Sequence, residues 1–72
     1  MRDIYVIYHK PSDFPGFDYV MRVHRMKGGD VTPTRKSWAG DTLEEMRGKV
    51  PAGMARFDRD LKDDPVIVEW WA

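Results

Sequence analysis

The apolar run at residues 65–72 constrains the fold more than any other stretch. It reads Pro-Val-Ile-Val-Glu-Trp-Trp-Ala, so that three β-branched residues precede two tryptophans. β-branched and aromatic side chains pack well on the pleated surface of a sheet. We therefore expect a strand at 65–71 that pairs with neighbouring strands. The rest of the chain then supplies those neighbours and a helix that covers one side.

The length of the chain limits how much stability such a sheet gains from its core. Seventy-two residues form a single domain, and a core of this size contributes only about 3–5 kcal/mol. The chain has no cysteine, which excludes disulfides and thiolate-bound metals. Three tryptophans, three tyrosines and three phenylalanines are a large apolar load. We therefore expect a homodimer or a protein partner to bury part of it.

Charge and hydropathy indicate a soluble protein. No run approaches the roughly 18 apolar residues of a membrane span, and residues 1–4 lack the apolar core of a signal peptide. We therefore expect a cytoplasmic location and no membrane partner. The net charge is zero, but residues 1–40 carry +3 and residues 41–72 carry −3. This asymmetry would orient a partner, although surface charge mostly serves solubility.

Three strands are predicted in the first half of the chain. Residues 3–9 contain five apolar residues in a row, as expected for a central strand covered on both faces. Apolar residues recur at every second position of residues 18–27, which predicts a second strand. The Gly28-Gly29 pair that follows is typical of a two-residue hairpin turn. Residues 31–37 then form the returning third strand.

The glycine turn sets the register of this predicted hairpin. His24 then faces Pro33, and Arg22 faces Arg35. The missing N–H of Pro33 is tolerated only on an edge strand, which places residues 31–37 at an edge of the sheet. The opposed arginines would repel each other unless an anion or a carboxylate lies between them.

A short helix is predicted at residues 42–49. Either Asp41 or Thr42 can act as its N-cap, because each is followed by a glutamate three residues later. Leu43 and Met46 share one helical face, and a proline ends the helix. A helix of about two turns does not form alone, so it must pack on the sheet.

Residues 54–59 fit two interpretations. Met54 and Phe57 recur at helical spacing, whereas Ala55, Phe57 and Arg59 alternate as in a short strand. We favour the strand, because turn-forming residues and then the apolar run follow. The fold class is then α+β. It is a mostly antiparallel four- or five-stranded sheet with one short helix packed on one face, in the order β-β-β-α-β-β.

The two faces of this sheet receive different side chains in our interpretation. Below the helix, the core combines residues from several elements: Tyr19, Met21, Val23, Leu43, Met46, Val66, Val68 and Trp70. The other face is left uncovered, and the aromatic side chains of Tyr5 and Trp71 lie on it beside Arg22 and His24. An uncovered face with exposed aromatic side chains is typical of a surface that binds a partner.

Sequence patterns of catalytic and metal-binding sites are absent. The acidic run at residues 58–64 does not form a calcium loop, because Lys62 stands at a ligand position. His9 and His24 would bind zinc only if the first two strands brought them together. No glycine-rich phosphate loop is present. We therefore expect neither a cofactor nor an enzymatic activity.

The basic hairpin is the main functional lead. Arginines beside aromatic side chains on an open sheet suit single-stranded nucleic acid, whereas a symmetric dimer would bury the same face. We expect a small non-enzymatic interaction module that self-associates or binds a protein partner through the open sheet face. The alternative is a nucleic-acid-binding domain that uses hairpin 22–36. The candidate binding residues are Tyr5, Arg22, His24, Arg25, Arg35, Lys36 and Trp71.

Overall fold

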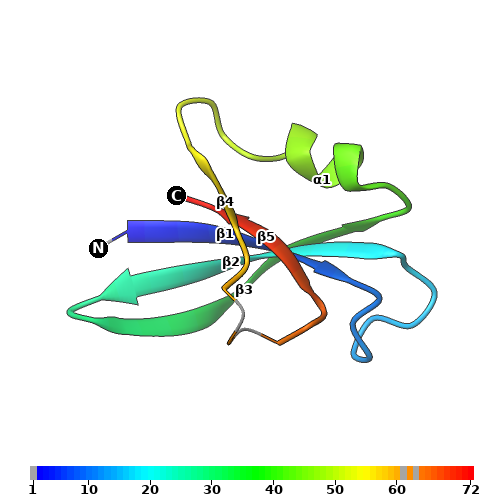
Figure 1. The fold of residues 1–72 in the computed structure, drawn as a ribbon, viewed down its shortest axis with the longest axis horizontal. Helices are drawn as coiled ribbons and strands as arrows, with labels where there is room; N and C mark the ends of the chain where they lie inside the picture. The colour runs from blue at the N-terminus through cyan, green and yellow to red at the C-terminus, as the bar shows by residue number, and fades with distance from the viewer. Residues whose placement is uncertain (1, 61, 63) are drawn as a thin grey trace.

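The computed structural model describes residues 2–60, 62 and 64–72. Along the chain the elements are β1 (Arg2–His9), β2 (Tyr19–Lys27), β3 (Asp30–Gly40), α1 (Leu43–Gly48), β4 (Arg56–Asp58) and β5 (Ile67–Trp71). The strands form one five-stranded antiparallel sheet in the order β3-β2-β1-β5-β4 (Figure 1). The predicted α+β fold and element order are confirmed, and residues 56–58 form a strand rather than a helix.

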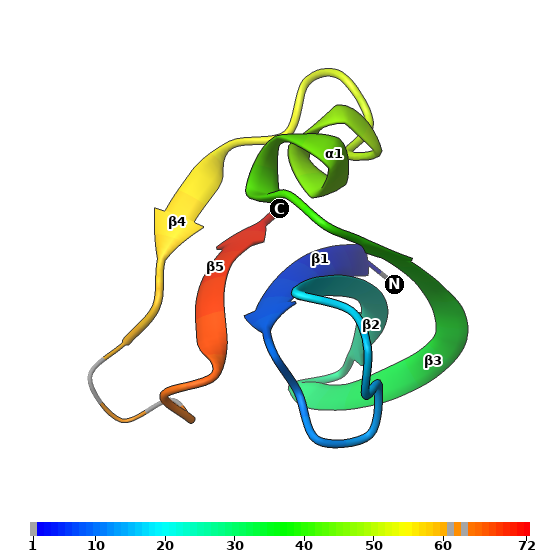
Figure 2. The same ribbon diagram turned by 90° about the vertical axis from the view of Figure 1, so that its right-hand side faces the viewer.

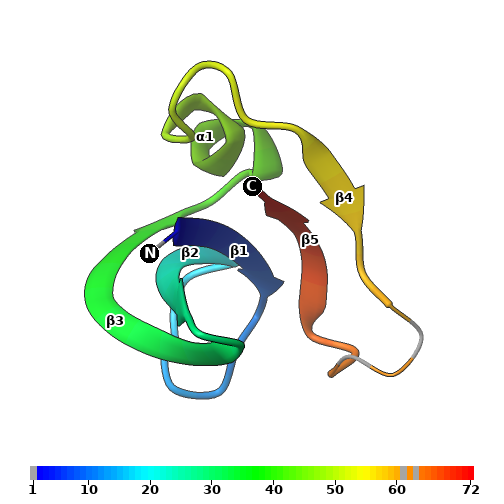
Figure 3. The same cartoon turned by 90° about the vertical axis from the view of Figure 1, so that its left-hand side faces the viewer.

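The sheet is strongly curved, and β3 bends around β1 and β2 (Figures 2 and 3). β3 and β4 are the two edge strands, so the edge position predicted from Pro33 is confirmed. β5 comes last of the five strands along the chain but lies between β1 and β4. The helix contacts β2 and β3 from one side. We call this side of the sheet the helix face, and the opposite side the outer face.

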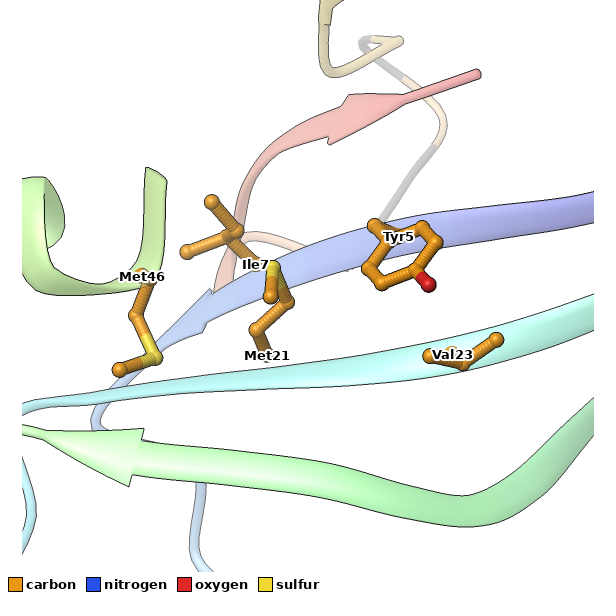
Figure 4. Packing of buried hydrophobic residues seen from close by; sticks show 5 residues of the cluster. All are labelled: Tyr5, Ile7, Met21, Val23 and Met46. Carbon is orange, nitrogen blue, oxygen red and sulfur yellow. The ribbon is translucent and has the colours of Figure 1, made fainter. Parts of the chain in front are cut away.

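The core lies between the helix and the middle of the sheet. Met46 of α1, with only 1% of its surface exposed, packs against Ile7 of β1 and Met21 of β2 (Figure 4). Tyr5 and Val23 extend this cluster along the same face, because they are cross-strand partners. Partly buried side chains surround it: Tyr19, Trp38, Leu43, Val50, Met54, Val68 and Trp71.

The helix begins directly after β3, where the chain passes close to its own first turn. Thr42 is the N-cap, and its hydroxyl accepts a hydrogen bond from the backbone N–H of Glu45 at 3.2 Å. Of the two predicted caps, Thr42 is therefore the one used. A Cβ on Gly40 would lie 2.6 Å from the Glu45 carboxylate and 3.0 Å from Met46 Cε. A larger residue at this position would therefore require the ends of the Glu45 and Met46 side chains to move.

The register of the β2–β3 hairpin follows the prediction only near its turn. The cross-strand pairs from the turn to Pro33 are those predicted. Beyond Pro33 the register shifts, and Arg22 lies opposite Ser37 instead of Arg35. The predicted Arg22–Arg35 pair is therefore wrong, and no anion is needed to separate the two guanidinium groups.

A bulge in β3 causes this shift. Residues 34–36 all lie opposite Val23, so β3 carries extra residues that the regular ladder does not pair. The hydroxyl of Thr34 donates to the carbonyl oxygen of Val23 at 2.7 Å and accepts from the backbone N–H of Lys36 at 3.2 Å. These two bonds replace ladder bonds that the bulge removes.

A second bulge changes which side chains of β5 face the core. Tyr8 pairs with Ile67 and Ile7 pairs with Glu69, so Val68 is the extra residue. In a bulge, two consecutive side chains lie on nearly the same side of the strand. Accordingly Val68 packs against the core cluster, and Glu69 also reaches toward α1, where it binds Arg47.

The bulge reverses the predicted positions of the two tryptophans. Trp71 packs against the core on the helix face. Trp70 lies opposite Val6 and stacks on Phe57 of β4, with ring centroids 4.3 Å apart. Placing Trp70 in the core was therefore wrong, and so was placing Val66 there, because Val66 lines a pocket on the outer face. The core position predicted for Val68 is confirmed.

Candidate functional site

Two of the predicted binding residues, Tyr5 and Trp71, do not lie on an uncovered face. Tyr5 is 7% exposed and stacks on Trp38, with ring centroids 5.9 Å apart. The indole N–H of Trp71 donates to Oε2 of Glu69 at 2.8 Å. Because both side chains lie in or against the core cluster on the helix face, placing them on an open aromatic platform was wrong. For Trp71 the physical reason is the bulge in β5, which moves its side chain to the helix face. Tyr5 lies on that face because it is the cross-strand partner of Val23.

Glu69 is a buried carboxylate at the junction of α1, β4 and β5. Its residue is 1% exposed, and Arg47 binds both oxygens, with Nε 3.1 Å from Oε2 and a terminal nitrogen 2.7 Å from Oε1. Arg56 of β4 lies 3.8 Å from Oε1. Burial alone would raise the pKa of Glu69, but hydrogen bonds from Arg47 and Trp71 and the nearby positive charges lower it below its usual value. The carboxylate fixes the helix to the sheet and has no reactive position open to a substrate.

The basic residues of the hairpin do not form one surface. Arg22 lies on the outer face opposite Val6, whereas Arg25 lies opposite Asp3 on the other face. Arg25 Nε binds the carboxylate of Asp3 at 3.3 Å. The predicted candidate Arg35 is exposed and lies in the bulge of β3.

Lys36, in the same bulge, places its ammonium group 5.5 Å from the ring centroid of Trp38. This is a cation–π contact that faces away from Arg22. The hairpin therefore offers separate charges rather than a continuous track for phosphates.

The two histidines do not converge. His9 pairs with Tyr19 and stacks on its ring, with centroids 4.7 Å apart. His24 pairs with Ile4, five positions further along β2, which is roughly 16 Å along a strand. Within residues 2–60, 62 and 64–72 no three histidine, aspartate or glutamate side chains gather as ligands for one metal ion. The geometry therefore gives no support to a zinc site at these histidines.

A pocket of about 360 Å³ lies on the outer face. Tyr8 of β1 and Arg22 and His24 of β2 line it, together with the loop at residues 11–14 and Val66 before β5. The pocket thus brings together two predicted binding residues, Arg22 and His24. Its walls come from separate segments, so no local pattern in the sequence marks it.

Four of the described polar side chains of this pocket lie in two pairs. The hydroxyl of Tyr8 and Nε2 of His24 are 2.9 Å apart, within hydrogen-bond range. Burial and the positive charge of Arg22 lower the pKa of His24 below its ordinary value, so the imidazole is neutral at neutral pH. Arg22 lies 3.7 Å from the carboxylate of Asp13 and 5.7 Å from the ring centroid of Phe14. The arrangement offers a guanidinium group and a neutral hydrogen-bonding pair.

The second candidate surface is the free edge of β4. All three residues of β4 are exposed, and Phe57 keeps 41% of its surface open beside Trp70. Arg56 binds the neighbouring carboxylate of Asp58 at 2.6 Å. Within the described part of the chain, β4 has a strand partner on one side only. The sequence analysis missed this edge, because only the strand order makes it one.

Comparison with known proteins adds no identity: no family model matches the chain, and no curated protein or solved structure matches it significantly. Among the described residues, no helix is long and apolar enough to cross a membrane. The function is therefore argued from the two surfaces just described.

Proposed function

We propose that the chain is a small non-enzymatic interaction module that self-associates by pairing the β4 edges of two copies. The observation that carries this proposal is the pattern of charges and free backbone groups on β4. A sheet edge with unpaired N–H and C=O groups is a template for another strand. The edge replaces the open sheet face expected from the sequence as the contact surface.

The backbone of β4 directs specific groups outward. Ala55 and Ala72 exchange both backbone hydrogen bonds, at 2.9 and 3.1 Å. Hydrogen-bonded and non-hydrogen-bonded pairs alternate along an antiparallel ladder. The Phe57–Trp70 pair is therefore hydrogen-bonded as well, and the N–H and C=O groups of Arg56 and Asp58 point away from β5. These are the groups that a second strand would bind.

A two-fold axis through Phe57 brings two copies of β4 together with complementary charges. In this antiparallel register each Arg56 lies opposite the Asp58 of the second copy. The outward N–H and C=O groups of these two residues can then form the hydrogen bonds between the two copies of β4. Phe57 meets its own copy, so the two Phe57–Trp70 stacks form one aromatic cluster on the outer face. A register centred on Arg56 or on Asp58 would instead oppose like charges, which is destabilising.

The other edge supports self-pairing less well. β3 carries Pro33, which has no N–H to donate, and the bulge at residues 34–36 interrupts its regular hydrogen bonding. Arg35 and Lys36 in this bulge would repel a second copy of the same edge. β4 is therefore the edge that fits a symmetric dimer.

The decisive experiment is a charge exchange measured by sedimentation or light scattering over a concentration series. We expect the wild-type chain to dimerise weakly, with Kd of roughly 10 μM to 1 mM for so small an interface. Asp58→Arg places an arginine opposite Arg56 of the second copy on both sides of the two-fold axis. The repulsion between these like charges should leave the chain monomeric. The double variant R56D/D58R restores opposite charges across the axis and should dimerise again.

Asp18→Arg is the matched control, because it makes the same charge change at an exposed position outside β4. It should leave the dimer intact. A wild-type chain that stays monomeric at about 1 mM, or a double variant that does not recover, would contradict the β4 proposal. Adding a single-stranded oligonucleotide to the same samples tests the nucleic-acid alternative, which requires binding that weakens as salt increases.

A further inference from the structure

The outer-face pocket has the size and composition of a small-molecule site. Its volume of about 360 Å³ falls within the range of roughly 300–1,000 Å³ that is usual for ligand pockets. Val20 on its floor is 1% exposed, and Phe14 and Pro33 add apolar walls. The pocket therefore joins an apolar surface to a few polar groups, as ligand sites do.

Arg22 has an unfilled capacity for hydrogen bonds. Its only anionic contact within the described residues is Asp13, at 3.7 Å. Charge-assisted hydrogen bonds between guanidinium and carboxylate are much shorter, at about 2.7–2.9 Å, and are often made by two parallel N–H groups. The Asp13 side chain is 64% exposed, so it is a loosely held carboxylate that another carboxylate can displace.

The charge around the pocket selects against strongly negative ligands. Among the described residues that line the pocket, Asp13 and Asp64 carry carboxylates and Arg22 carries a guanidinium group. The Asp64 carboxylate accepts a hydrogen bond from the backbone N–H of Val66 at 3.1 Å, which holds it at the rim. A phosphate or other polyanion would be repelled strongly by both. A monocarboxylate carries a single negative charge, and it can take the place beside Arg22 when the exposed side chain of Asp13 turns into solvent.

The other end of the pocket recognises polar groups without a formal charge. The Tyr8 hydroxyl and the His24 imidazole are in contact at 2.9 Å. A neutral imidazole presents one donor and one acceptor nitrogen, and a phenol presents both functions. These groups can orient a ligand through hydrogen bonds. Because they are neutral, they do not compete with Arg22 for the negatively charged group of the ligand.

We propose that this pocket binds a small monocarboxylic acid with a compact apolar or aromatic body. The ligand carboxylate displaces Asp13 and accepts hydrogen bonds from Arg22, and its apolar body lies against Val20, Phe14 and Pro33. This site is separate from the β4 edge, so either proposal can fail without the other.

The test uses the full chain and benzoate as the probe, followed by two-dimensional NMR. We expect saturable shifts at Tyr8 and His24 with Kd of roughly 1–10 mM, as suits a ligand of few atoms. Arg22→Gln should weaken binding at least about tenfold. Asp13→Asn removes the competing carboxylate and should tighten binding about two- to fivefold, the value of an exposed ion pair.

Two controls make the result decisive. Arg25→Gln removes a basic residue of the same strand that is paired with Asp3 on the helix face, and it should leave benzoate affinity unchanged. Benzyl alcohol and inorganic phosphate should bind at least about tenfold more weakly than benzoate. The proposal is overturned if wild-type shifts do not saturate by about 50 mM, if either probe equals benzoate, or if Asp13→Asn does not tighten binding.

Discussion

Removing Arg47 should destabilise the fold far more than removing a comparable surface arginine. Within the described part of the chain the buried Glu69 carboxylate accepts three hydrogen bonds, and Arg47 supplies two of them. In Arg47→Met, Oε2 keeps its bond from Trp71. Among the described residues, Oε1 is then left with only Arg56 at 3.8 Å, which is beyond hydrogen-bond range. A buried carboxylate is then left without its main partner.

The magnitude follows from how deeply each partner is buried. Removing one member of a fully buried ion pair costs about 3–5 kcal/mol. The side chain of Arg47 is 41% exposed, whereas that of Glu69 is 2% exposed, so water can partly solvate the vacated side of the carboxylate. We therefore expect Arg47→Met to lower the free energy of unfolding by about 2–3 kcal/mol, at or below the bottom of that range. This loss is about half or more of the stability that the core of a chain this size supplies.

Urea unfolding at pH 7, followed by tryptophan fluorescence, measures this loss. With a urea m value of about 1 kcal/mol/M, the midpoint should fall by about 2–3 M. The control is Arg25→Met, which removes an exposed pair whose side chains are 50% and 42% exposed and should cost less than about 1 kcal/mol. If Arg47→Met costs no more than Arg25→Met, the view that Glu69 fixes the helix to the sheet is refuted.

The same pair predicts a pH dependence with a definite sign. The pKa of Glu69 is lowered in the folded state, so the unfolded chain takes up a proton at this carboxyl before the folded chain does. The stability from this group is present above the unfolded pKa and is lost as the pH falls through the folded pKa. In Arg47→Met the pKa of Glu69 rises, so the difference in stability between wild type and variant should narrow in acid.

Three further changes test the core, the cap and the pocket. Met46→Ala empties a site that is 1% exposed and should cost about 2–4 kcal/mol in urea unfolding. Thr42→Ala removes the N-cap hydroxyl and should cost about 1 kcal/mol in thermal unfolding, and Thr42→Ser should retain most of that stability. Because burial and the charge of Arg22 lower the pKa of His24, its contribution to stability should decline as the pH falls below the unfolded value. NMR titration should show the His24 pKa rising in Arg22→Gln, and an unchanged value would exclude the Arg22 charge as a cause.

Local sequence signals predicted the parts of the fold that depend on local backbone geometry. Gly28 and Gly29 both have positive φ, at 58° and 90°, as a primed hairpin turn requires. The turn then set the correct pairing as far as Pro33, and the proline correctly marked an edge. The periodicity of Leu43 and Met46 likewise placed the helix on the sheet.

The bulges were not predictable in the same way. No glycine marks the bulge at residues 34–36, whose backbone is satisfied by the Thr34 hydroxyl. The bulge at Val68 is visible only when β5 is aligned on β1. Since one extra residue transfers every later side chain to the other face, this single irregularity exchanged the positions of Trp70 and Trp71. Tyr5 lies on the helix face for a separate reason, because it is the cross-strand partner of Val23.

The candidate surfaces likewise combine residues that the sequence singled out with neighbours that only the tertiary structure supplies. Arg22 and His24 were singled out by their residue types, and they do share a pocket. Their neighbours in that pocket come from a loop, from β3 and from the segment before β5, so only the tertiary structure brings them together. The β4 edge depends on strand order in the same way, because the three residues Arg56–Asp58 carry no signal of an edge by themselves.

The position of β5 between β1 and β4 has a consequence for the order of folding. The β1–β2–β3 meander joins neighbours in sequence, whereas the pairing of Tyr5 with Trp71 closes a loop of roughly 65 residues at an entropic cost of about 3–4 kcal/mol. We expect the meander to form first and β5 to dock after the rate-limiting step, so that mutations in β5 mainly accelerate unfolding. Among the residues that the structure describes, β4 pairs with the sheet only through β5, so a chain displays an ordered β4 edge only once β5 has docked. Self-association through the β4 edge would thus be limited to fully folded chains, and folding intermediates that lack this edge would not take part in it.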